Sequence, residues 1–361
     1  MPKRSAIRTE AARLRARFEA AGGVPVETGI LQPAATLLDL YGEDIRARAY
    51  VTSDALRGEQ MLRPDFTVPV VQMHMEHGAE PARYTYAGEV FRRQEDDPDR
   101  ANEYMQVGFE IFARADPAAA DAEVFGLFHE VLAPLGLRAA TGDIGILMAA
   151  VAGLCTSDAR KVALRRHIWR PRRFRALMDR FAGKSAVPES RIALLAAADP
   201  FAAAGPMIGL RSRSEIAARI ETLRADAETP RISEGEVALI DAILQVRETS
   251  DNALEHLRDI AVDMPAIGPA VERLEARLEA LAALGIAAGG LPFEASYGRT
   301  QMEYYDGFVF GFYAGGRADL PAVASGGRYD ALTRQLGQGR EIPAVGGVIR
   351  PGLVLDLGGA A

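Results

Sequence analysis

The sequence predicts an α+β core that is interrupted by a helical insertion. Residues 24–150 mix alternating strands with turns, and residues 155–290 are rich in Ala, Leu and Arg. The chain from residue 291 onward returns to strands and glycines. We therefore expect a first core part over residues 1–155, a helical insertion over 156–290 and a second core part over 291–361.

Composition and charge limit the classes of protein to which this chain can belong. Its 361 residues are 48% hydrophobic, which is enough to bury a large core. The 42 Lys and Arg against 49 Asp and Glu give a net charge of −7, which argues against a globally basic nucleic-acid binder. The single cysteine, Cys155, excludes an internal disulfide, and we expect it to be a small buried hydrophobic residue. No apolar run reaches the roughly 18–20 residues of a membrane helix, so no membrane contact is expected.

Two helices of the core follow from apolar residues at helical spacing. Ala11, Leu14 and Phe18 predict an N-terminal helix. A second helix is predicted to begin at Asp116-Pro117, where an N-cap is followed by Pro at the first helical position. The apolar stripe over 124–135 then continues for about three turns, which indicates a helix packed on the core.

The insertion carries one clearly amphipathic helix. Pro269 is suited to the first turn, and a stripe of Val271, Leu274, Leu278 and Leu281 follows it. We expect this stripe to face the core. The charged positions between the apolar ones are expected to be exposed: Glu272, Arg273, Glu275, Arg277 and Glu279.

A local basic cluster also lies in the insertion. Between Ser157 and Arg180 there are nine basic residues against two acidic ones. This pattern fits a solvated helix face, a docking surface for an acidic partner protein, or a remnant of an RNA-contacting surface. Trp169, the only tryptophan, lies within the cluster and fits either an interface anchor or core packing.

Two predicted strands, over residues 84–92 and 104–112, carry the first sign of a binding site. In the second strand, alternation places the apolar residues from Met105 to Ile111 on one face and Gln106, Gly108 and Glu110 on the other. An amide and a carboxylate on either side of a glycine can hold an amino group. A plain solvent-exposed face of an antiparallel sheet accounts for the pattern equally well.

These two strands resemble motif 2 of the class II aminoacyl-tRNA synthetases, specifically of the histidyl type. The resemblance implies the class II antiparallel sheet flanked by helices. Further segments resemble the family's Arg-Pro-acidic-x-Thr loop, its tyrosine pair, its glycine-rich strand and turn, and its motif 3, in the family's order: residues 62–67, 303–310, 324–332 and 346–350.

Several positions depart from the synthetase pattern. The family's catalytic arginine falls at Thr300, and Arg299 stands one place away, on the opposite face of a strand. Ile349 replaces the acidic residue of motif 3, and the acidic residues of the segment 96–99 would repel ATP phosphates. The eleven residues after Arg350 leave no room for the family's anticodon-binding domain.

This set of kept and lost motifs resembles the regulatory subunits of the short-form ATP phosphoribosyltransferase, a family of synthetase paralogues. The resemblance implies a subunit that is required for the first step of L-histidine biosynthesis and mediates feedback by histidine. It implies a hetero-oligomer with the catalytic subunit, a homodimer formed through the N-terminal region, and a location in the cytoplasm. No catalytic residue, no aminoacylation, no cofactor and no tRNA are expected. One alternative is an active adenylate-forming ligase for a small amino-acid-like substrate, and another is an RNA-binding relative.

The resemblance also implies a site for a histidine-like ligand. Asp65 and Thr67 are expected to bind the α-amino group, with Gln106 and Glu110 completing the polar shell. Arg92, at the end of the first strand, is suited to a carboxylate or a phosphate oxygen.

Aromatic and glycine residues are expected to line the rest of this site. Tyr304 and Tyr305 are adjacent on a predicted strand, so their rings should point to opposite faces unless a bulge intervenes; either ring also fits simple core packing. Gly326-Gly327 allows the backbone to approach a ligand closely, or forms a plain turn. His74 and His77 lack the spacing of a zinc site, and no metal is expected.

Overall fold

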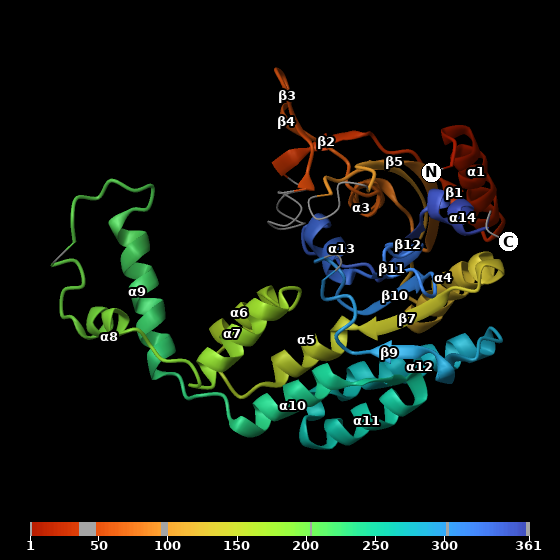
Figure 1. Cartoon of the computed structure of the whole chain (residues 1–361). Coiled ribbons are helices and arrows are strands. Elements are labelled where there is room, and N and C mark those ends of the chain that lie inside the picture. Colours follow the sequence, from red (N-terminus) through yellow and green to blue (C-terminus); the bar gives the residue numbers. More distant parts are fainter. Residues whose placement is uncertain (1, 36–47, 95–99, 203, 301–302, 359–361) are drawn as a thin grey trace.

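The computed structural model describes residues 2–35, 48–94, 100–202, 204–300 and 303–358. Its centre is a nine-stranded sheet, beside which lies a small three-stranded sheet (Figure 1). In spatial order the large sheet consists of β1 (Val24–Pro25), β5 (Ala82–Phe91), β6 (Glu103–Phe112), β12 (Ala344–Ile349), β11 (Ala324–Arg328), β10 (Phe308–Tyr313), β7 (Arg138–Asp143), β9 (Pro292–Glu294) and β8 (Arg247–Thr249). The small sheet consists of β2 (Leu31–Pro33), β4 (Gly58–Leu62) and β3 (Val51–Asp54).

The pairing of the large sheet is antiparallel from β5 to β7, as the sequence predicts. The pairs β1–β5 and β7–β9 are parallel, so the sheet as a whole is mixed. The β5–β6 hairpin pairs Tyr84 with Glu110 and Gly88 with Gln106. The two predicted strands are thereby confirmed.

Helices cover both faces of the sheet. On one face α1 (Arg4–Ala20), α4 (Pro117–Leu132) and α14 (Pro351–Gly358) enclose an apolar cluster that includes Val107, Phe109 and Ile111 of β6. On the other face α3 (Thr67–His77) and α13 (Asp330–Leu336) pack over the side that carries Gln106, Gly108 and Glu110. The polar face of β6 is therefore buried and not solvent-exposed.

The two predicted core helices form as expected. In α1, Ala11, Leu14 and Phe18 are the buried residues. In α4 the Asp116 carboxylate accepts a hydrogen bond from the Ala119 backbone N–H at 2.9 Å, with Pro at the start of the helix. A short 3₁₀ turn, η1 (Ala133–Leu135), follows α4.

Helices dominate the segment between β7 and β9. They are α5 (Ile144–Gly153), α6 (Asp158–Arg166), α7 (Pro171–Phe181), α8 (Glu189–Ala196), α9 (Arg213–Glu228), α10 (Glu234–Gln245), α11 (Ser250–Asp263) and α12 (Gly268–Ala283), with the 3₁₀ turns η2 (Pro265–Ile267) and η3 (Ala288–Gly290). Figure 1 shows α10 to α12 beside the sheet, whereas α8 and α9 extend away from it. Between α10 and α11 the chain forms β8, which pairs with β9 at the edge of the sheet.

Two expectations about exposure are wrong. Arg277 of α12, expected to be exposed, is only 3% exposed, because α12 packs on α4 and carries this side chain to Asp121 and Asp143. Cys155, expected to be buried, is exposed. It lies in the short connection between α5 and α6, where its backbone N–H donates to Glu236. Within the described ranges, no helix combines the length and the apolar character that crossing a membrane requires.

Candidate functional site

The loop between β4 and α3 brings Asp65 and Thr67 to the sheet. Arg63 holds this loop: its guanidinium donates to the carbonyls of Glu89 at 2.9 Å and Thr28 at 2.6 Å, and it stacks on Phe66. A Cβ at Gly88 of β5 would lie 2.5 Å from Arg63 Nη2, so this close approach requires glycine. Asp65 is consequently fixed in a buried position, 3% exposed.

Glu110 lies at the centre of the site and is fully buried. Its carboxylate accepts hydrogen bonds from Thr67 Oγ1 at 3.1 Å, from the Tyr86 hydroxyl at 2.8 Å and from the Tyr329 hydroxyl at 2.5 Å. Burial raises the pKa of Glu110 to about 7, and the three hydroxyl donors oppose that rise. A Cβ at residue 346 would lie 1.4 Å from Glu110 Oε2, so Gly346 leaves the space that the carboxylate occupies.

Gln106 lies two residues before Gly108 on the same face and is 1% exposed. Its Oε1 atom has no hydrogen-bond partner in the described structure. Because a buried acceptor without a donor costs about 1–3 kcal/mol, this oxygen is suited to an N–H of a ligand.

Arg92 approaches the same loop from the end of β5. Its Nε donates to the Pro64 carbonyl at 2.7 Å, and Nη2 lies 3.6 Å from Asp65 Oδ2. The Tyr304 hydroxyl lies 3.5 Å from the same carboxylate oxygen. The structure thus brings Arg92, Asp65 and Tyr304 together, although they come from three distant parts of the sequence.

The strand predicted at Tyr304 and Tyr305 is wrong. Residues 303 and 304 form a turn, and β10 begins only at Phe308. Strand alternation does not apply there, so both rings are buried in one cluster with centroids 4.9 Å apart. Burial raises the pKa of the Tyr305 hydroxyl.

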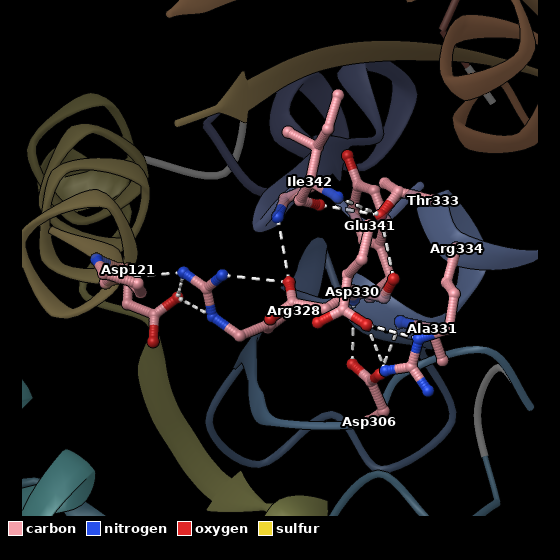
Figure 2. Close-up of polar contacts among 12 residues, drawn as sticks. Asp121, Asp306, Arg328, Asp330, Ala331, Thr333, Arg334, Glu341 and Ile342 are labelled. Atoms are coloured by element: carbon pink, nitrogen blue, oxygen red, sulfur yellow. Dashed lines mark hydrogen bonds and ion pairs between the residues drawn. The ribbon is translucent and has the colours of Figure 1, made fainter. Parts of the chain in front are cut away.

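An aspartate holds this turn against α13. The Asp306 carboxylate accepts hydrogen bonds from the backbone N–H of Asp330 at 3.0 Å and of Ala331 at 2.6 Å (Figure 2). Burial and the neighbouring Asp330 carboxylate raise the pKa of Asp306 to about 7. These two hydrogen bonds hold the turn that contains the tyrosine pair against the start of α13, which follows Tyr329.

A buried ion network lies behind the site. Arg328 donates to Asp121 of α4 at 2.7 Å and to Asp330 at 3.0 Å (Figure 2). Arg277 of α12 donates to the same Asp121 at 3.1 Å and to Asp143 at 2.8 Å. Helices far apart in the sequence are thereby joined to the glycine-rich strand β11.

Sequence reasoning missed several residues of the site and of this network. Arg328, Tyr329 and Asp330 stand in the glycine-rich segment that carried the resemblance, which was the available signal. Tyr86 stands in the strand that resembles motif 2, so the same signal was available for it. Asp121 had none, because charge alone does not indicate a partner 207 residues away.

Four of the nine basic residues of the cluster form ion pairs within the described structure. Arg160 and Arg180 bind Asp226 at 2.7 and 2.6 Å, and Arg175 binds Asp241 at 2.6 Å. None of the three alternatives considered for the cluster included this internal pairing. The acidic partners lie 46 to 66 residues further along the chain.

The turn between α6 and α7 contacts the tyrosine segment directly. Trp169 Nε1 donates to the Tyr305 carbonyl at 3.1 Å, and Arg170 pairs with Glu303 at 3.1 Å. Trp169 is half-buried against the core, which decides between its two alternatives in favour of packing.

Arg299 also points to the insertion. Its Nε donates to the Ile168 carbonyl at 2.8 Å, and its guanidinium lies 5.0 Å from the Phe174 ring centroid. Burial lowers the pKa of Arg299 to about 10, with the nearby Arg175 as a second cause. The guanidinium is thus engaged by α7 and by the turn that precedes it.

No cluster of three His, Cys, Asp or Glu side chains suited to a metal ion occurs among the residues for which the structure gives positions. His74 is buried, lies 3.1 Å from the Tyr84 hydroxyl and stacks on Phe112, and burial lowers its pKa. It is a core histidine. The acidic segment 96–99 lies outside the described residues.

Known proteins are similar to this chain in sequence and in fold. The family model for histidyl-tRNA synthetase matches residues 2–226 and 214–351. The ATP phosphoribosyltransferase regulatory subunit of Brucella anthropi is 31% identical over 357 residues, which cover 92% of this chain and 93% of that protein.

Two crystal structures are similar in fold. An ATP phosphoribosyltransferase regulatory subunit/histidyl-tRNA synthetase from Bacillus halodurans gives a TM-score of 0.65 at 20% identity, covering 98% of this chain and 79% of that one. A histidine–tRNA ligase subunit from Alicyclobacillus acidocaldarius gives a TM-score of 0.60 at 24% identity, covering 99% and 93%. The predicted class II synthetase-like fold is confirmed.

Proposed function

The chain belongs to the histidyl-tRNA synthetase family and, within it, to the ATP phosphoribosyltransferase regulatory subunits, and we propose that it controls the catalytic subunit of that enzyme by binding L-histidine. As such a subunit it acts in L-histidine biosynthesis, at the first step, and mediates feedback by the end product. The curated relatives support this regulatory role and not the alternative of an adenylate-forming ligase.

The proposal of histidine binding rests on the burial and the hydrogen-bond partners of Glu110. This carboxylate is fully buried, and the donors that reach it from the described residues are neutral hydroxyls. A carboxylate offers about four lone-pair sites, so three donors leave room for one more. A ligand N–H, from an ammonium group or an imidazole ring, would supply that donor and a compensating charge.

The neighbouring side chains match the other groups of an amino acid. Asp65, with Thr67 beside it, and the unpartnered Gln106 Oε1 are suited to the α-amino group. Arg92 is suited to the α-carboxylate, since guanidinium and carboxylate pair in bidentate fashion. Tyr304 and Tyr305 would lie against the imidazole ring as aromatic walls.

The contacts of Arg299 support a non-catalytic role. Thr300 occupies the position of the synthetase family's catalytic arginine, and Arg299 is engaged by Ile168 and Phe174. We therefore propose that this chain neither activates histidine with ATP nor aminoacylates tRNA. We further propose a homodimer formed through the N-terminal region, assembled with the catalytic subunit in the cytoplasm.

The experiment combines calorimetry with two activity assays. Titration of the purified chain with L-histidine should show binding that Glu110→Gln weakens about tenfold or more, because the negative charge and one of the two acceptor oxygens are lost. Glu103→Gln, at the exposed start of the same strand, is the control and should bind like the wild type.

The two activity assays test the proposed regulatory role and the proposed absence of catalysis by this chain. The purified catalytic subunit should be more active with this chain than without it, and histidine should inhibit the assembly. Histidine-dependent ATP–pyrophosphate exchange by this chain alone would contradict the non-catalytic role. Unchanged activity of the catalytic subunit would contradict the regulatory one.

A further inference from the structure

Two helices of the insertion leave part of their apolar surface uncovered. The arm, residues 184–202 and 204–230, contains α8 and α9 and projects away from the sheet (Figure 1). Of the residues in these two helices only Ile220 is buried. Helices of this length depend on packing for their stability, so a pair that buries so little has an apolar face available to a partner.

This apolar face forms a groove of about 320 Å³. Residues of both helices and of the segment between them line it: Leu194, Pro200, Phe201, Ala204, Met207, Arg211, Ile216, Arg219, Ile220 and Leu223. Met207, which lines the groove, is 48% exposed, and the next residue in the chain, Ile208, is 94% exposed. Apolar side chains gathered around a groove on an exposed arm are typical of a protein–protein interaction site.

The charge of the groove indicates the chemistry of its partner. Arg211 and Arg219 are the charged residues in its described lining, and neither has a carboxylate within ion-pair distance in the described structure. Two acidic residues of the arm are engaged in other contacts. Asp226 binds three arginines and Glu215 caps the start of α9 through Ser212.

We propose that the groove of the arm docks an acidic amphipathic segment of the catalytic subunit, whose apolar side chains fill the groove and whose carboxylates pair with Arg211 and Arg219. This proposal rests on the proposed function and names the surface through which the chain binds the catalytic subunit. A second copy of this chain is a poorer occupant. A two-fold contact through this groove would place the same unpaired arginines of both copies at one interface.

The test measures binding of the wild-type chain and its variants to the purified catalytic subunit by surface plasmon resonance. Arg211→Glu/Arg219→Glu should weaken the complex about tenfold or more, since it places carboxylates opposite carboxylates. Met207→Ser, which removes an exposed apolar side chain from the lining of the groove, should weaken it several-fold. Circular dichroism and histidine binding should be unchanged in both variants, because the arm lies outside the histidine site.

The matched control is Arg172→Glu/Arg173→Glu on α7, two exposed arginines outside the groove. This double variant should bind the catalytic subunit within about twofold of the wild type. If both double variants lose the same affinity for the catalytic subunit, the effect is one of general charge and the proposal is wrong. Unchanged binding of the groove variants would overturn it while leaving the regulatory function intact.

Two further outcomes separate the proposal from the function on which it rests. If the wild-type chain does not bind the catalytic subunit at all, both are wrong. If the groove variants change only the self-association of this chain, as measured by sedimentation, the groove joins copies of this chain and the proposed partner is wrong.

Discussion

The Tyr329 hydroxyl donates a hydrogen bond of 2.5 Å to Glu110 Oε2. This contact connects the residue before α13 with the middle of β6. Because Asp306 caps α13, the tyrosine turn, the helix and the buried carboxylate form one connected unit.

Replacing Tyr329 by Phe should destabilise the protein in a pH-dependent way. The buried carboxylate loses one of three donors, which should lower the free energy of unfolding by about 1–3 kcal/mol where Glu110 is ionised. Below a pH of about 6 the loss should shrink, because protonated Glu110 depends less on the donor. Urea denaturation at about pH 8 and about pH 5.5 measures both values. Tyr50→Phe, whose hydroxyl has no partner in the described structure, should show no such difference.

Histidine binding should release protons. The pKa of Glu110 is raised from 4.5 to about 7, so the free folded protein holds a proton there between these values. A positively charged group of the bound ligand stabilises the ionised form of Glu110 over the protonated form. Binding at about pH 6.5 should therefore release roughly 0.5–0.8 proton, and affinity should increase as the pH rises toward 7. Calorimetry in two buffers with different ionisation enthalpies measures the release. Glu110→Gln should abolish it, and proton uptake by the wild type would contradict the assignment.

Trp169→Phe should weaken histidine binding more than it changes folding. The variant removes the N–H that fixes the Tyr305 carbonyl, while it keeps an aromatic ring against the core. Loss of one such hydrogen bond is worth about 1 kcal/mol, which corresponds to roughly a fivefold change in dissociation constant. Calorimetry gives the affinity, and thermal melting checks the fold. The exposed variant Arg173→Met is the control and should bind histidine normally.

Arg277→Met should be among the most damaging single changes. It removes the cation that joins Asp121 to Asp143 and leaves a buried carboxylate without compensation, at a cost of about 3–5 kcal/mol. Arg273→Met, one turn earlier on the exposed side of the same helix, should cost less than about 1 kcal/mol. Urea denaturation distinguishes them, and equal stability of the two variants would show that the network contributes nothing.

Local patterns predicted the elements whose causes are local. The cap at Asp116, the apolar stripe of α1 and the alternation along β6 each depend on residues within a few positions of one another. Patterns of this range can be read without a structure. The site residues were predicted mainly from the resemblance. Alternation alone did not decide whether the polar face of β6 binds a ligand or is exposed to solvent.

The errors concern contacts between distant segments. Arg277 was expected to be exposed because a charged residue on an amphipathic helix usually is, and its partners stand 156 and 134 residues earlier. The turn at Tyr304 was predicted as a strand, because aromatic residues favour strands and the capping contact from Asp306 to α13 cannot be seen in a local pattern.

The edge strand β8 makes the region from α5 to α12 a structural part of the large sheet. This strand completes the large sheet beside β9, and α12 contributes Arg277 to the interior. Excising residues 156–290 would remove the outer neighbour of β9 and the Arg277 cation, which would leave Asp143 without a counter-ion and Asp121 with Arg328 alone. A chimaera that exchanges this region between paralogues must therefore keep β8 together with β9, and Arg277 together with Asp121 and Asp143.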